Sequence, residues 1–307
     1  MKDNTFNKSL MSEFKPQNQA HIDLEHSLAK NQLYKDCYRY MQSDKLTLPT
    51  IPDVAQKIRI AINNDKANSN TISRVVQIDP SITARLIKIS NSPLYHGRRK
   101  IESCPEALTR LGLKNAQNII TAFSMKGVFS AKSAFIKRQM TELWMHSSYV
   151  AAISAVFAHK TPGFDPDRAM LAGLIHDIGI VPILAHADKH QQMISQPKDL
   201  AETIKLLRTE IGLQIIKKWD FPADFEDVIR HSENWHRDTN ADADYTDIVM
   251  IAQLHSYIGK VDIKKMPKMD ALPAYKKLLA GNLDLDTSIN ILDQAKDEIQ
   301  QIQQMLN

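Results

Sequence analysis

The sequence has little cysteine and little net charge, and each shortage excludes a class of protein. Cys37 and Cys104 are its only cysteines, too few for a disulfide framework or a cysteine-rich zinc module, which favours a reducing compartment. The 39 basic and 35 acidic residues leave a net charge of only +4, which gives no electrostatic footprint for binding a nucleic-acid backbone. We therefore do not expect nucleic acid as a partner.

Long apolar runs are missing as well. The amino terminus is polar and lacks the apolar core of a signal peptide. No later stretch approaches the roughly 18 uninterrupted apolar residues that a membrane span needs. These observations, together with the scarce cysteine, predict a cytoplasmic protein without a membrane partner.

Glycine is also scarce, with nine residues in 307, and β-branched residues rarely alternate in period two. Apolar residues instead recur every three or four positions from Leu46 onward, which indicates helix after helix. Asp79-Pro80 and Asp165-Pro166 each place a capping side chain before a proline at the first helical position. The pattern predicts an all-α chain with helices near 52–63, 70–78, 80–91, 104–111, 114–128, 137–159, 167–178, 199–218, 222–232, 245–259, 272–280 and 287–306.

The stretch LAGLIHDIG, residues 171–179, is the best candidate for chemistry. An apolar helix ends there in His176-Asp177, and burying an imidazole beside a carboxylate is costly unless something binds them. Because adjacent residues diverge by about 100° around a helix, both reach one cation only if other segments supply further ligands. His146, about 30 residues earlier, is the obvious second contributor. A helical histidine taken singly, such as His159 or His190, is more often a hydrogen-bonded core residue.

The order of these motifs resembles the HD superfamily of metal-dependent phosphohydrolases, in which such residues hold a divalent ion that activates water. Two upstream stretches are similar to the amino-terminal half of HDOD domains, namely LPTIPDVAQKI and IDPSITARLIKISNSPLYHGRRKIESCPEALTRLGLKNAQNII. Further along, WDFPADFEDVIRHSE resembles the W-x-L-P…I…HH segment of that family. The resemblance covers roughly residues 44–260, and an unrelated helical bundle is the alternative.

The resemblance implies a multi-helical, HD-phosphohydrolase-like fold with two helical lobes. We expect an N-terminal extension over 1–43, loose at first and helical from Leu24 to Met41. The HDOD domain would span 44–260, with an N-terminal lobe at 46–128 and an HD-like lobe at 137–260. Helices within 261–307 are expected to pack on the HD-like lobe.

Several positions depart from the metal-binding pattern. Arg208 best matches a position that holds a histidine in the related HD-GYP phosphodiesterases, and their histidine pair becomes His231-Ser232. The final aspartate of the superfamily is replaced by Gln253 or His255, depending on the alignment. Losing an anionic ligand and adding a guanidinium both disfavour a second cation, so a two-metal mechanism is hard to build.

The metal ligands that remain are His146, His176 and Asp177, with His231 or His255 as a further one. We expect no required cofactor, and a single divalent ion is the one metal that this ligand set leaves open.

A charged loop offers a second candidate site. Residues 91–100 combine a proline, a glycine, an aromatic residue and three cations, and we assign Tyr95, Arg98 and Arg99 to the binding of a ligand or partner. A solvated loop is the alternative interpretation.

The resemblance implies a bacterial signal-transduction module that regulates by binding and is not an enzyme. Signalling proteins, including those of cyclic-dinucleotide pathways, are the expected partners, and the oligomeric state is open. A residual metal-dependent phosphohydrolase acting on nucleotides or cyclic dinucleotides is one alternative, and a purely structural scaffold is another.

Overall fold

The structure is a computed structural model that describes residues 31–64, 67–95, 97, 99–194, 197–239, 242–260, 266–279, 292–293 and 295–307. Within these residues every regular element is a helix and none is a strand, so the predicted all-α fold is confirmed. The predicted loose segment and Leu24 fall outside the described residues, as does Arg98.

The first half of the chain forms short helices. They are α3 (Gln32–Gln42), α4 (Asp53–Ile62), α5 (Ser69–Val76), α6 (Pro80–Ser90), η2 (Pro93–Tyr95), α7 (Cys104–Leu111), α8 (Leu113–Ser124) and η3 (Met125–Val128). The second half contains α9 (Ala134–Lys160), α10 (Pro166–Ile175), α11 (Ile180–Lys189), η4 (Gln191–Met193), α12 (Pro197–Lys218), α13 (Ala223–His231), α14 (Tyr245–Ser256), η6 (Met269–Ala271), α15 (Pro273–Leu279) and α17 (Lys296–Leu306).

The helix starts read from the sequence are confirmed in the cap geometry. The Asp79 side chain accepts hydrogen bonds from the amides of Ser81 and Ile82, and Pro80 opens α6. Asp165 caps α10 in the same way, with Pro166 at the first position. Each carboxylate satisfies amides that have no partner within the helix, which fixes where the helix begins.

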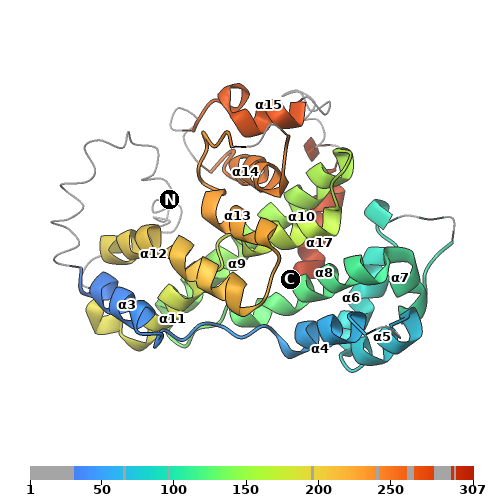
Figure 1. The fold of residues 1–307 in the computed structure, drawn as a ribbon, viewed down its shortest axis with the longest axis horizontal. Helices are drawn as coiled ribbons and strands as arrows, with labels where there is room; N and C mark the ends of the chain where they lie inside the picture. Colours follow the sequence, from blue (N-terminus) through green and yellow to red (C-terminus); the bar gives the residue numbers. More distant parts are fainter. Residues whose placement is uncertain are drawn as a thin grey trace.

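The 27-residue helix α9 is the centre of the molecule, with α10, α14 and α17 packed around it (Figure 1). Small residues in its middle let the neighbours approach closely. A Cβ added to Gly173 of α10 would lie 2.8 Å from the Ser154 hydroxyl and 3.0 Å from the Ala151 Cα. Only glycine therefore permits this spacing, which sets the last turns of α10 against the middle of α9.

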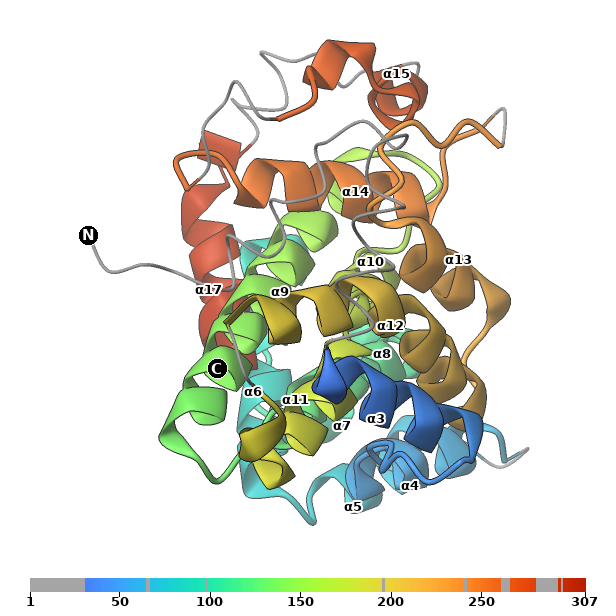
Figure 2. The ribbon, with the colours of Figure 1, turned by 90° about the vertical axis from the view of Figure 1, so that its left-hand side faces the viewer.

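The helices α4–α7 gather at one end of the molecule, and α8 joins them to α10 of the other half (Figure 1). The helix α3 lies apart from that group and packs across α12 and α11 (Figure 2). Near the carboxyl end, α15 packs on α14, and α17 packs on α9 while also touching α6 and α8. The predicted lobe boundaries stay predictions.

One apolar stretch, Pro166–Lys189, has the length and composition of a membrane-spanning helix. Within its most apolar window of 18 residues, 94% of the chain is buried inside the protein. The core therefore accounts for its apolar character.

Candidate metal centre

Three elements bring His146, His176 and Asp177 together. His146 lies in the first half of α9, while His176 and Asp177 lie in the short turn between α10 and α11. The turn is held against α9 by the close approach at Gly173. All three side chains are buried, with 8%, 3% and 2% of their surfaces exposed in chain order.

The predicted convergence of these residues is confirmed. Asp177 Oδ2 lies 3.2 Å from His176 Nε2 and 3.8 Å from His146 Nε2. The two imidazole rings meet edge to face with centroids 5.3 Å apart. One ligand atom from each residue lies within 4.8 Å of the other two, which is a spacing suited to shared coordination of one ion.

The hydrogen bonds leave the inner face of this cluster unsatisfied. With its proton on Nδ1, His176 donates to the Gly173 carbonyl at 2.8 Å and presents a bare Nε2 to Asp177. His146 Nε2, His176 Nε2 and Asp177 Oδ2 are all buried without a hydrogen-bond partner. A lone pair that faces a carboxylate oxygen needs a proton or a cation between them. The three residues therefore fit one divalent cation.

The protonation states of the cluster also suit a cation. Burial, followed by the charge of His176, lowers the pKa of His146 to about 3, so its imidazole is neutral near pH 7. Burial alone would raise the pKa of Asp177, but His176 and Arg208 outweigh it and hold the pKa below its usual range. A neutral imidazole and an ionised carboxylate are the forms that bind metal.

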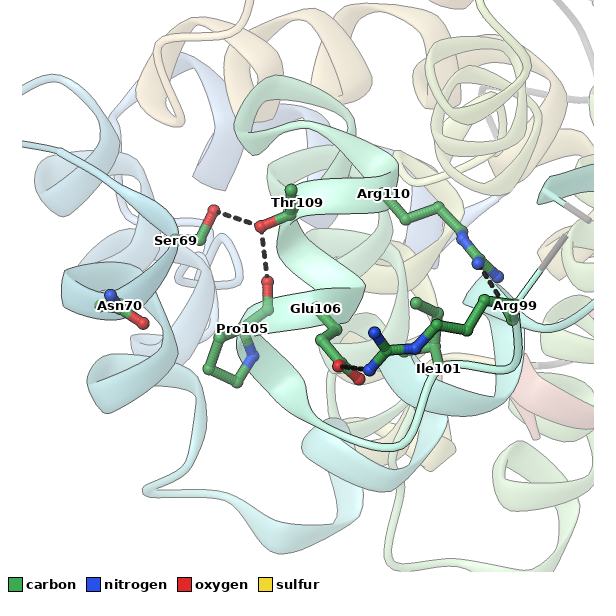
Figure 3. Close-up of a pocket in the computed structure, with 8 residues that line it drawn as sticks. All are labelled: Ser69, Asn70, Arg99, Ile101, Pro105, Glu106, Thr109 and Arg110. Carbon is green, nitrogen blue, oxygen red and sulfur yellow. Dashed lines mark hydrogen bonds and ion pairs between the residues drawn. The ribbon is translucent and has the colours of Figure 1, made fainter. Parts of the chain in front are cut away.

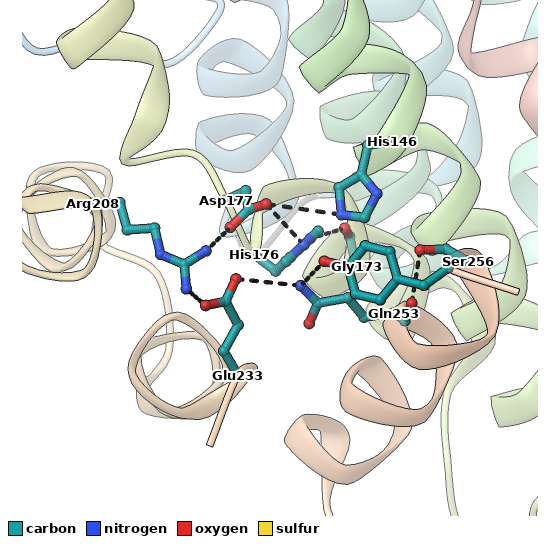
Figure 4. A network of polar contacts seen from close by, with 9 residues as sticks. His146, Gly173, His176, Asp177, Arg208, Glu233, Gln253 and Ser256 are labelled. Carbon is teal, nitrogen blue, oxygen red and sulfur yellow. Dashed lines mark hydrogen bonds and ion pairs between the residues drawn. The ribbon is translucent and has the colours of Figure 1, made fainter. Parts of the chain in front are cut away.

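Arg208 of α12 closes the cluster on its other side (Figure 4). Its Nη1 donates to Asp177 Oδ1 at 3.0 Å, and its Nη2 pairs with Glu233. The guanidinium is 11% exposed, so solvent screens its charge weakly. It binds the carboxylate oxygen that a second cation would need, and it repels such a cation.

Gln253 of α14 is buried and contacts two residues that surround the cluster. Its Nε2 donates to the Tyr257 hydroxyl at 3.2 Å and lies 3.5 Å from Glu233 Oε1 (Figure 4). His255, the other candidate for this position, is not in the cluster, because its Nδ1 donates to the Ile251 carbonyl and its ring packs on Phe157. The structure thus decides for Gln253, which carries no charge.

Sequence reasoning missed two residues of this network. Glu233 neutralises Arg208, and Tyr257 stacks on the His146 ring at 5.7 Å with an angle of 9° between the planes. Glu233 directly follows the His231-Ser232 pair in the matched segment, so its position was a signal for the site. Tyr257 carried no comparable signal, since a single aromatic residue near a helix end is common in cores.

The structure does not bring His231, the predicted further metal ligand, into this cluster. Among the described residues, the group around Asp177 that could hold a metal contains only His146 and His176 besides it. His231 ends α13, and its side chain is half-buried at the surface. The chain turns after α13, and Glu233 in that turn points toward Arg208 (Figure 4).

The charged loop is only partly as expected. Tyr95 donates its hydroxyl to Asp167 at the start of α10, so this side chain joins the two halves of the molecule and its hydroxyl is not available to a ligand. Arg99 is exposed, pairs with Glu106, and lines a pocket of about 390 Å³ with Arg110 (Figure 3). Arg98 lies outside the described residues, and no feature of the structure tests its assignment.

Comparisons with known proteins agree with this geometry. The HDOD domain family model matches residues 48–235. An uncharacterised protein of Treponema pallidum (strain Nichols) is 23% identical over 201 residues, and the match covers 61% of this chain but only 38% of that protein.

Two solved structures share the fold. One is a protein from Shewanella amazonensis SB2B, provisionally described as a metal-dependent phosphohydrolase, with a TM-score of 0.75 at 23% identity over 91% of this chain and 99% of its own. The other is an HDOD domain protein of unknown function from Geobacter sulfurreducens, with a TM-score of 0.62 at 22% identity over 91% and 97% of the two chains.

Proposed function

Since the chain belongs to the HDOD domain family, we propose that it is a regulatory signal-transduction module that binds a protein partner or small ligand and does not hydrolyse phosphate esters. The contact between Arg208 and Asp177 carries this proposal. The guanidinium occupies Oδ1 of Asp177, so that only Oδ2 of this carboxylate is open to metal. The chain keeps the scaffold of a phosphohydrolase while the charge of the site favours at most one cation.

The ligand set supports the same conclusion. A two-metal site places two cations about 3.5–4 Å apart and needs carboxylates to balance them. The cluster offers Asp177 alone, because Glu233 is paired with Arg208 and position 253 is an amide. Two further cations beside a buried arginine would repel one another strongly at these distances.

A residual metal-dependent phosphohydrolase is the second candidate, and one observation favours it. The unpartnered atoms of His146, His176 and Asp177 would hold a single divalent ion. Such an ion, when bound, acts as a Lewis acid and lowers the pKa of a water molecule. The chain's own contribution would be three ligands and a guanidinium, with no uncommitted carboxylate left to take a proton from water.

The binding part of the proposal points to the pocket beside Arg99. It lies between α5, α7 and the segment from Arg99 to Ile101, with Thr109 and Ser69 hydrogen-bonded across it (Figure 3). Both hydroxyls and two arginines suit an anionic group or an acidic protein surface. Signalling proteins, including those of cyclic-dinucleotide pathways, are the partners that we propose, in a cytoplasmic setting.

Counting the cations at the cluster tests the observation that carries the proposal. Metal-free protein is titrated with Mn²⁺, and electron paramagnetic resonance distinguishes isolated ions from exchange-coupled pairs. We expect the spectrum of isolated Mn²⁺ only. The variant His176→Ala should bind at most one ion fewer than wild type. The control His159→Ala, at an exposed histidine, should bind as many ions as wild type. A coupled pair that disappears in His176→Ala would contradict the proposal.

A further inference from the structure

A second group of metal-ligating side chains lies away from the candidate metal centre, where α3 packs on α11. Asp36 comes from α3, His186 from the last turn of α11, and His190 from the residue that follows that helix. One ligand atom from each lies within 4.8 Å of the other two. From the sequence alone, His190 is a single histidine with no recognisable partner. In the fold it lies beside two other possible metal ligands, Asp36 and His186.

The geometry of this second cluster, Asp36, His186 and His190, is that of a prepared ligand set. His186 Nε2 donates a hydrogen bond to Asp36 Oδ2 at 2.8 Å, where a bound cation would take the place of the shared proton, and the rings of His186 and His190 have centroids 4.5 Å apart. His186 lies in the last turn of α11 and His190 is the residue that ends the helix, so the chain brings both imidazoles to the same end of α11. The Tyr40 ring packs edge-on against His186 at 5.1 Å and holds it in place.

Burial and charge suit an ion at this position. Asp36 and His186 are 3% and 7% exposed, while His190 is half-buried, so the cluster is open to solvent on one side only. Arg39 pairs with Asp36 Oδ1, which leaves Oδ2 as the oxygen that faces the imidazoles. Burying a carboxylate charge costs free energy. A cation bound between the carboxylate oxygen and the two imidazoles would offset that cost.

The space beside the histidines can hold the remaining ligand. A cavity of about 100 Å³, lined by His186, His190, Tyr40 and Thr47, adjoins the cluster and has room for a water molecule. Lys45 and Lys189 also line this cavity, but both are exposed, so their charges are screened by solvent.

We propose that Asp36, His186 and His190 bind a zinc ion, with water as the fourth ligand, and that this ion fastens α3 to α11. Two imidazoles, one carboxylate and an open position are a ligand set that Zn²⁺ accepts in tetrahedral geometry. The helix α3 precedes the residues matched by the HDOD model, so the site would tie a segment outside that match to the family scaffold. Zinc would then control how firmly the amino-terminal segment is docked.

Zinc stoichiometry and affinity test the site. Wild type, His190→Ala and the exposed-histidine control His159→Ala are titrated with Zn²⁺ by calorimetry, and bound metal is counted by mass spectrometry. His190 is the residue to change, because it is half-buried beyond the helix end and its loss should leave the fold intact. We expect His190→Ala to bind one equivalent fewer than the other two, or to bind it at least about tenfold more weakly. All three proteins keep His146, His176 and Asp177. Zinc bound at that centre therefore contributes equally to each stoichiometry and cancels when they are compared.

A second readout separates a built site from loosely bound zinc. Co²⁺ should give the intense visible absorption of a tetrahedral site in wild type and in His176→Ala, but not in His190→Ala. Hydrogen exchange of the α3 amides should slow when Zn²⁺ is added to wild type and stay unchanged in His190→Ala. Equal stoichiometry and affinity in His190→Ala and His159→Ala, or zinc binding without slower exchange in α3, would overturn the proposal.

Discussion

At the scale of single residues, charge decides what the candidate metal centre can hold. Asp177 is the only carboxylate of the cluster that faces both imidazoles, and Arg208 binds its other oxygen. The amide of Gln253, which carries no charge, joins the surrounding network through the Tyr257 hydroxyl. One substitution there therefore changes the charge of the site by a full unit without a large change of shape.

Changing Gln253→Asp should strengthen metal binding at the cluster. An added carboxylate supplies both a ligand and a negative charge, so we expect the affinity for Mn²⁺ to rise by about tenfold or more, which corresponds to about 1.4 kcal/mol. Gln253→Asn is the matched control, since asparagine has the shape of aspartate without its charge. Calorimetric titration measures both, and equal affinities in the two variants would remove position 253 from metal binding.

His255 should make the free energy of unfolding depend on pH. Burial lowers its pKa below the ordinary value of 6.5, and the hydrogen bond to the Ile251 carbonyl offsets this only in part. The unfolded chain then binds a proton that the folded protein resists, so stability is present above about pH 6.5 and is lost as the pH falls below it. Each such group contributes up to about 1.4 kcal/mol per pH unit.

Denaturant unfolding at pH 7.5, 6.5 and 5.5 measures this effect in wild type, His255→Gln and His236→Gln, the last at an exposed histidine. We expect the slope of stability against pH to be shallower in His255→Gln and unchanged in His236→Gln. Parallel slopes in all three proteins would show that His255 takes up its proton in the folded state as easily as in the unfolded one.

The sequence identified the residues of the cluster only where a motif marked them. His146, His176 and Asp177 follow from motif order, and they converge. The choice between Gln253 and His255 could not be made, because they are two positions apart on one helix and only the packing of α14 decides which faces the cluster. That His231 lies apart from this group could not be read from the sequence either, since the direction of the chain after α13 is set by tertiary contacts.

At the scale of helices, the contact between α11 and α12 brings Arg208 to Asp177. A Cβ added to Gly179 would lie 1.9 Å from the Arg208 carbonyl oxygen and 2.7 Å from the Gly212 nitrogen. The two backbones touch at this point, and neither can move without displacing a helix. The glycine that follows the His-Asp pair in the sequence is therefore required by this close approach.

Gly179→Ala should destabilise the fold by about 1–3 kcal/mol or more, because an added methyl group would overpack a backbone contact. The matched control is Gly127→Ala, where an added Cβ meets nothing within 4 Å. Thermal unfolding of both variants measures the difference. Equal melting temperatures would mean that α12 shifts freely, and Arg208 would then not be fixed on Asp177.

The helices themselves were largely predictable. Proline and aspartate at the starts of α6 and α10 located those helices, and the apolar period located α9 and α12. The way in which the helices pack against one another could not be predicted from the spacing of apolar residues. The close approach at Gly173 and the position of α3 on α11 and α12 depend on side-chain volumes from segments far apart in the chain.

At the scale of the whole molecule, several contacts join the halves of the chain, in addition to the packing of α8 on α10 and of α3 on α12. Tyr95 hydrogen-bonds to buried Asp167, and α17 touches helices of both halves. In the loop that we predicted as a recognition surface, Tyr95 therefore has a structural role, whereas Arg99 is exposed and cationic. Of the two described residues that we assigned to binding, Arg99 is the one whose side chain is exposed to a partner.

Arg99→Glu should weaken partner binding and leave the fold intact. The side chain is 78% exposed, so its reversal should change stability by no more than about 0.5 kcal/mol. Arg138→Glu is the matched control, because Arg138 is also an exposed arginine paired with a glutamate. Recovery of partners from the native cell should fall for Arg99→Glu at low salt, and the difference from wild type should shrink as salt rises. Equal recovery at low salt by both variants would exclude the loop.

The claim that this HD-type scaffold binds without hydrolysing is tested most directly by a turnover assay. Purified wild type is incubated with cyclic di-GMP and with p-nitrophenyl phosphate, in Mn²⁺ and in Mg²⁺, beside His176→Ala and Asp177→Ala. We predict no hydrolysis above background in wild type, with both variants indistinguishable from it. Hydrolysis by wild type that is abolished in both variants would contradict the account, because it would make the cluster a catalytic site.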